Sequence, residues 1–158
     1  MGKYSFVGEL GGNYTLLHCT FSGYNNFMGR TDPSFYLSNA DFEPEGSPKI
    51  ANPLTYNIVN CIIDGSEDDE VELNTSGAGT IVAVMSYCLI KQKKDGVVPA
   101  GQNNILNLDP LYKNFSKNDF HLSATSPSIN KGFSLGITID FDGDPRDAQP
   151  DIGCYEFK

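Results

Sequence analysis

Three aspartates near the C-terminal end are the residues best suited to hold a cation. Asp140, Asp142 and Asp144 alternate around Gly143, and alternating carboxylates with a glycine are the donor pattern of a calcium-binding loop. The full loop also needs a closing glutamate, and this chain has Gln149 at that position. We therefore interpret the segment first as a turn held by its own hydrogen bonds, with calcium as the alternative.

A second group of residues could contact a sugar. Aromatic faces beside polar groups are what a carbohydrate-binding groove requires, and two long polar segments combine both kinds of side chain. The candidates are Tyr24, Phe27, Arg30, Asp32, Tyr36 and Phe42. The same rings could instead pack these segments onto the rest of the fold, and both interpretations stay open.

No complete catalytic motif occurs in the sequence. It lacks Gly-x-Ser-x-Gly, His-Glu-x-x-His and a phosphate-binding glycine loop, so the corresponding sites are not indicated. Of the two histidines, His18 is expected to face outward on a strand and His121 to make structural hydrogen bonds. The acidic run at 67–72 and the lysines near residue 91 are typical of solvated turns.

The elements that must position these residues are organised by a short sequence motif, the cysteine phrase, that occurs three times. A cysteine stands at its centre, two β-prone residues follow, and a polar residue, usually with a glycine, ends it. The cysteines of the three copies are Cys19, Cys61 and Cys88. Their spacing is unequal, at 42 and then 27 residues.

Two insertions explain the unequal spacing. Leu37 and Leu73 mark a second strand in successive repeats, and the first repeat has longer segments on both sides of its marker, at 24–33 and 40–53. These segments carry the Pro, Gly and Asx residues of surface loops. We therefore predict strands stacked on successive turns of a solenoid, with the cysteines in a ladder about 4.8 Å apart. Thiols on parallel strands point the same way, which favours free thiols over disulfides.

Composition limits the classes of function. The 158-residue chain has a formal net charge of −9, whereas nucleic acids and anionic membrane surfaces attract basic patches. No apolar run approaches the roughly 20 residues that cross a bilayer. The 16 glycines and 9 prolines favour an all-β fold with short strands. The first residues do not form a secretion signal, and we expect a fragment whose signal was removed.

The C-terminal region resembles a known family. The motifs that carry the resemblance lie at 109–111, 118–122, 126–132, 140–146 and 150–157. They are similar to the C-terminal end of bacterial right-handed parallel β-helix proteins of the pectate-lyase-like superfamily, often with a "choice-of-anchor" terminal region. The resemblance covers about the last 50 residues and implies an exported or cell-surface protein. It also implies that 140–146 closes the helix, with Arg146 placed to pair with a carboxylate.

Polysaccharide lyases of this superfamily generally use a basic residue to abstract a proton. If this chain were such an enzyme, the resemblance would place the base and its partners among the charged residues of the first repeat. The candidates are Arg30, Lys49, His18, Asp32, Glu43 and Glu45. The spacing of these residues does not establish that they converge.

The sequence thus predicts an all-β, right-handed parallel β-helix of about three to four turns. We expect one domain, 1–158, with repeat turns in 1–107 and a terminal turn and end cap in 108–158. The expected function is non-catalytic: carbohydrate recognition or scaffolding in an exported protein, with a polysaccharide as partner. The alternative is a polysaccharide lyase or glycoside hydrolase acting on acidic glycans. Calcium is the one cofactor candidate, and neither nucleic acid nor a membrane span is expected.

Overall fold

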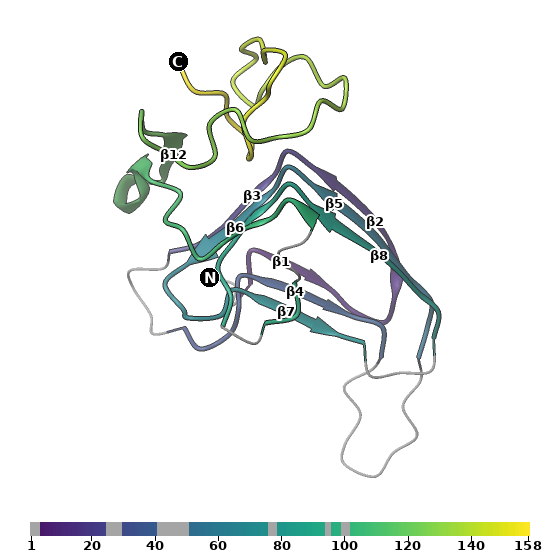
Figure 1. Cartoon of the computed structure of the whole chain (residues 1–158). Coiled ribbons are helices and arrows are strands. Elements are labelled where there is room, and N and C mark those ends of the chain that lie inside the picture. Colours follow the sequence, from purple (N-terminus) through teal and green to yellow (C-terminus); the bar gives the residue numbers. More distant parts are fainter. Residues whose placement is uncertain (1–3, 25–29, 41–50, 76–78, 94–95, 99–101) are drawn as a thin grey trace.

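The structure is a computed structural model that describes residues 4–24, 30–40, 51–75, 79–93, 96–98 and 102–158. Ten of its strands form three parallel sheets (Figure 1). The first sheet contains β1 (Phe6–Gly8), β4 (Phe35–Ser38) and β7 (Val71–Asn74). The second contains β2 (Gly12–Leu17), β5 (Leu54–Val59) and β8 (Ile81–Ser86). The third contains β3 (Thr20–Gly23), β6 (Ile62–Gly65), β9 (Leu89–Ile90) and β10 (Ile105–Leu106).

The chain visits the three sheets in the same order three times, as β1–β2–β3, β4–β5–β6 and β7–β8–β9. We call each passage a circuit. Figure 1 shows the equivalent strands of successive circuits lying beside one another, with two sheets meeting at an apex. The all-β class and the parallel sheets are as predicted, and the strand order is compatible with a β-helix.

Apolar side chains at alternate strand positions fill the space between the sheets. In the second sheet, Leu16, Ile58 and Met85 are paired in register across the three circuits and belong to the main core. In the first sheet, Phe6 pairs with Phe35, and their rings stack with centroids 5.1 Å apart. Such rows fix the register, because a shift of one residue would turn every core side chain to the other face.

A left-handed residue forms the corner between the second and third sheets in every circuit. His18, Asn60 and Tyr87 have φ of 51°, 57° and 53°, and the cysteine that follows each one turns into the core. The Cys19 N–H donates to the Cys61 sulfur, and the Cys61 N–H to the Cys88 sulfur, both at 3.4 Å. All three cysteines and Cys154 are free thiols. The predicted cysteine ladder is confirmed, whereas His18 lies at a corner and not on a strand.

The C-terminal region lies against the side of the stack. It was expected to cover the last turn as an end cap, but it packs over the apex (Figure 1). Its Ile152 and Leu122 form a second core with Ile62 and Leu89, which face outward from the third sheet. This region also contains the antiparallel pair β11 (Tyr112–Asn114) and β12 (Asp119–Leu122), with the 3-10 helix η2 (Phe115–Lys117) between them. Apolar residues on the outer face of the sheet explain the lateral position, because they too must be covered.

The cysteine ladder predicts the order in which the thiols react. Cys61 and Cys88 are fully buried, and burial raises the pKa of Cys61. Cys19 is half-buried, and hydrogen bonding with the Cys61 thiol lowers the pKa of Cys19 to about 7. Because the thiolate is the reactive form, we expect an aromatic disulfide reagent to modify Cys19 first. Burial raises the pKa of Cys154, which should react later.

The measurement is a time course of labelling at neutral pH, with the modified peptides identified by mass spectrometry. Cys19→Ser should remove the fastest phase, and Cys61 and Cys88 should be labelled only when the protein unfolds. Rapid labelling of Cys61 or Cys88 in the native protein would show that the ladder is accessible.

Candidate functional site

A cavity of about 370 Å³ lies on the outer face of the third sheet. It combines an aromatic ring, carboxylates, amides, an ammonium group and an aliphatic side chain. The lining residues are Tyr24, Asp64, Asp68, Lys91, Gln92, Asn107, Leu108 and Asp109. Pockets with a few converging polar groups are the usual places for small ligands, and we take this cavity as the candidate site.

The alternation of strand β6 places Asp64 in the cavity. Ile63 belongs to the main core, so its neighbours Ile62 and Asp64 face outward. Ile62 is covered by the C-terminal region, whereas Asp64 lines the cavity. The chain then brings Lys91 beside it, because β9 pairs with β6 in parallel and Lys91 follows directly on β9.

Asp64 is nearly buried and is held by one short hydrogen bond. The residue is 2% exposed, and Oδ2 accepts a hydrogen bond from the Tyr24 hydroxyl at 2.5 Å. Burial raises the pKa of Asp64, although the Tyr24 hydrogen bond and Lys91 oppose the shift. The Lys91 ammonium donates to the Gly65 carbonyl at 2.8 Å. Asp64 therefore holds a proton more readily than an ordinary aspartate.

An apolar rim stands beside these polar groups. The ring of Tyr24 stacks on Phe115 with centroids 4.4 Å apart and meets Tyr112 edge-on at 6.3 Å. Phe115 and Leu108 are 43% and 53% exposed. The site thus offers exposed aromatic and aliphatic surface next to hydrogen-bonding groups.

The structure brings one of the predicted sugar-contacting residues, Tyr24, into the cavity. Arg30 is buried and forms an ion pair with Glu70 at 2.5 Å, and Arg30 also donates to the carbonyl oxygen of Asp32 at 2.7 Å. The Asp32 carboxylate accepts a hydrogen bond of 3.4 Å from Tyr4. Tyr36 is 1% exposed and belongs to the core. The other two candidates, Phe27 and Phe42, lie outside the described residues, as do Lys49, Glu43 and Glu45.

Sequence reasoning missed most of the cavity. Asp64 was part of the repeated phrase, and Lys91 was assigned to a solvated turn. The available signal was position: both are charged residues three places after a ladder cysteine, where strand alternation turns a side chain outward. Asp109 gave no such signal, because it follows the repeats.

In the aspartate-rich turn, backbone N–H groups bind both oxygens of the Asp140 carboxylate. Asp140 Oδ1 accepts from the N–H groups of Asp142 and Asp144 at 2.9 and 2.8 Å, and Oδ2 accepts from the Glu156 N–H at 2.9 Å. Burial acts to raise the pKa of Asp140, but these donors outweigh it and the pKa lies below its usual value. Among the described residues, no group of three or more His, Cys, Asp or Glu side chains is arranged to hold a metal ion. These contacts favour the hydrogen-bonded turn over the calcium loop.

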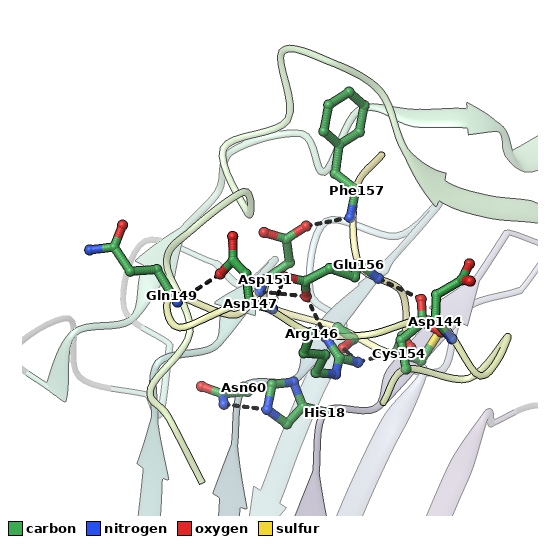
Figure 2. A network of polar contacts seen from close by, with 12 residues as sticks. His18, Asn60, Asp144, Arg146, Asp147, Gln149, Asp151, Cys154, Glu156 and Phe157 are labelled. Atoms are coloured by element: carbon green, nitrogen blue, oxygen red, sulfur yellow. Dashed lines mark hydrogen bonds and ion pairs between the residues drawn. The ribbon is translucent and has the colours of Figure 1, made fainter. Parts of the chain in front are cut away.

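Arg146 is the centre of the polar network that holds the C-terminal region together (Figure 2). Its guanidinium donates to Glu156 Oε2 and to the carbonyl oxygens of Gly153 and Cys154, all at 3.0 Å. Glu156 Oε2 also accepts from the Asp151 N–H at 3.0 Å. The side chains of Arg146 and Glu156 are 2% and 7% exposed. The expected pairing of Arg146 with a carboxylate is present, and its role is structural.

The two histidines should give the C-terminal region opposite pH dependences. His18 lies beneath it at 7% exposure, and burial and the Arg146 charge lower the pKa of His18 to about 4. As the pH falls from about 6.5 to about 4, the unfolded chain gains a proton on His18 that the folded chain does not. Up to about 3 kcal/mol of stability is lost over this window.

His121 should change the stability with pH in the opposite direction. Its Nε2 and Nδ1 lie 2.8 Å from Asp142 and 2.6 Å from Asp119, and these carboxylates raise the pKa of His121. The stabilisation by charged His121 is complete below pH ~6.5 and is lost as the pH rises through the folded pKa. NMR titration of the two rings measures both effects, and His121→Gln should remove the loss above pH ~6.5. A His18 ring that titrates near its ordinary pKa would contradict its burial under this region.

Comparisons with known proteins give no match for this chain, whether with family models, curated proteins or solved structures. In the part of the chain that the structure describes, no helix is long and apolar enough to cross a membrane.

Proposed function

We propose that this chain is part of a right-handed parallel β-helix of the pectate-lyase-like kind, in an exported or cell-surface protein. The repeated sheet order, the left-handed corners and the cysteine ladder support the helical arrangement. The hand is that of nearly all parallel strand connections. The family and the location rest on the C-terminal motifs, whose buried Arg146–Glu156 pair is consistent with a structural role.

We infer that the cavity beside Asp64 binds carbohydrate without cleaving it. The observation that carries this inference is exposed apolar surface beside polar groups in one cavity. Leu108 is an exposed lining residue, and the exposed ring of Phe115 stacks on the lining residue Tyr24. The polar groups are those of Asp64 and Asn107. A sugar ring has an apolar face and a rim of hydroxyl groups, so it needs both kinds of surface at once. Carboxylate and amide oxygens accept hydrogen bonds from hydroxyls, and the amide nitrogens donate to them.

The test is calorimetry with a panel of oligosaccharides, comparing the protein with Phe115→Ala. Phe115 is an exposed residue on helix η2, so its removal should leave the fold intact. It should weaken binding about tenfold or more, because the aromatic surface that Phe115 forms with Tyr24 is lost. Phe141→Ala is the matched control, because Phe141 is 78% exposed and its ring contacts Tyr155, whereas the ring of Phe115 stacks on the cavity residue Tyr24. If no oligosaccharide binds, or if both variants bind like the wild type, the cavity is not a sugar site.

One observation favours hydrolysis as a second candidate function. Asp64 has a raised pKa and shares its cavity with Asp68 and Asp109, and glycoside hydrolases use a protonated and an ionised carboxyl group as a pair. A lyase is less favoured, because Arg30 and His18, two of the candidate bases, are buried. Release of reducing ends, lost in Asp64→Asn while binding persists, would establish hydrolysis.

A further inference from the structure

The cavity beside Asp64 carries an excess of negative charge. Asp64, Asp68 and Asp109 line it together with a single cation, Lys91. The raised pKa of Asp64 removes part of one negative charge, yet the two other carboxylates still outnumber the ammonium group. A ligand in this cavity therefore meets a negative local potential.

The same carboxylates act on Tyr24, whose hydroxyl lies in the cavity and donates to Asp64. Burial and the hydrogen bond to Asp64 raise the pKa of the Tyr24 phenol, and the charges of Asp64, Asp109 and Glu70 raise it further. Each of these carboxylates thus disfavours a second negative charge at the place where the Tyr24 hydroxyl stands. A uronate carboxylate placed beside that hydroxyl would meet the same repulsion.

A neighbouring cavity extends the acidic surface. It has a volume of about 360 Å³, shares Asp68 with the first, and also contains Glu67 and Asp69 with one cation, Lys93. Lys93 is already paired with Asp69 at 3.9 Å. A chain that runs from one cavity to the other would pass several carboxylates, and the whole protein has a formal net charge of −9.

We propose that this site selects glycans by charge, binding those with free amino groups most tightly, neutral glycans less tightly and uronate glycans least. The proposal rests on the carbohydrate-binding function of the same cavity. It names hexosamine-containing glycans as the preferred ligand class, since a protonated amine is the sugar substituent that complements Asp68 and Asp109.

The experiment uses two pairs of oligosaccharides whose members differ mainly in charge. The first pair is a glucosamine oligomer and its N-acetylated form, and the second is a galacturonate oligomer and its methyl ester. Affinities are measured by calorimetry at a pH where the amines are protonated, at about 0.01 M and about 0.15 M ionic strength. The amine should bind more tightly than the N-acetyl form, and the methyl ester more tightly than the free acid. Both differences should shrink in the higher salt.

Two charge-removing variants tie these preferences to the cavity. Asp109→Asn keeps the oxygen that accepts from the Leu111 N–H at 2.7 Å, and Asp68→Asn removes the charge of the second of these lining carboxylates. Each should reduce the amine preference by roughly threefold, the effect of one charge at several ångströms in a wet site. Glu9→Gln removes the same charge from an exposed residue that does not line the cavity, and it should change nothing.

The two proposals fail in different ways. Binding that depends on Phe115 but favours galacturonate, or preferences that survive in both aspartate variants, would overturn the charge selection and leave sugar binding intact. Absence of binding by all four oligosaccharides would overturn sugar binding and the charge selection with it.

Discussion

Glu70→Gln should lower the free energy of unfolding by about 3–5 kcal/mol, because it leaves the charge of Arg30 buried without a carboxylate partner. Glu70 is fully buried, and Arg30 donates to its Oε1 at 2.5 Å. The Glu70 carboxylate also accepts from the Ser34 and Glu67 N–H groups at 2.7 and 2.8 Å. The amide retains some acceptor capacity, but it cannot compensate the guanidinium charge. Urea denaturation, with the slope held constant, measures the effect.

Glu72→Gln is the control for this prediction. It makes the same chemical change two residues further along the chain, at an exposed position on β7, so it should alter stability by no more than about 0.5 kcal/mol. Similar losses for Glu70→Gln and Glu72→Gln would mean that the buried pair is solvated in solution. Gly65→Ala should act like Glu70→Gln, because its Cβ would overlap the Glu70 carboxylate and the Arg30 guanidinium.

The Arg30–Glu70 ion pair explains why the repeated phrase ends in a glycine. The repeated phrase ends in Gly23 in its first copy and in Gly65 in its second. A side chain at either position would overlap the Arg30–Glu70 pair, so the glycines make room for two buried charges. The sequence revealed the spacing of the repeat but not this cause, since Arg30 lies in one long insertion and Glu70 in the acidic run.

The repeat itself was predictable because its signal is local. Each cysteine phrase encodes a strand, a left-handed corner and a second strand, and parallel stacking brings equivalent positions together. The cavity was not predictable in this way. Its Tyr24, Asp64 and Asp109 come from three different parts of the chain, and Tyr24 and Asp64 meet only because residues about one repeat apart are stacked.

The lateral position of the C-terminal region escaped prediction for a related reason. Ile62 and Leu89 are consecutive in sequence with the core residues Ile63 and Ile90. A run of apolar residues shows that both faces of a strand are covered but not what covers them. The sequence indicated a cap, and the outward-facing residues of the third sheet determined where it packs.

Asn60→Ala should destabilise the protein by about 3–4 kcal/mol by weakening this lateral attachment. The Asn60 side chain accepts from the Phe133 N–H at 2.8 Å, donates to the Phe133 carbonyl at 2.7 Å, and lies 2.8 Å from His18 Nε2. Each hydrogen bond contributes about 1 kcal/mol, and alanine adds about 1 kcal/mol of strain at a left-handed φ of 57°.

Asn60→Gly separates these two causes, because glycine tolerates the left-handed backbone while losing the side-chain bonds. It should cost about 1 kcal/mol less than Asn60→Ala. Asn57→Ala, at an exposed position on β5, the strand that leads to Asn60, is the control and should be nearly neutral. Hydrogen exchange locates the effect: amides of 108–158 should lose protection before those of the parallel sheets. Uniform loss across both regions would instead show that the lateral region and the stack unfold as one cooperative unit.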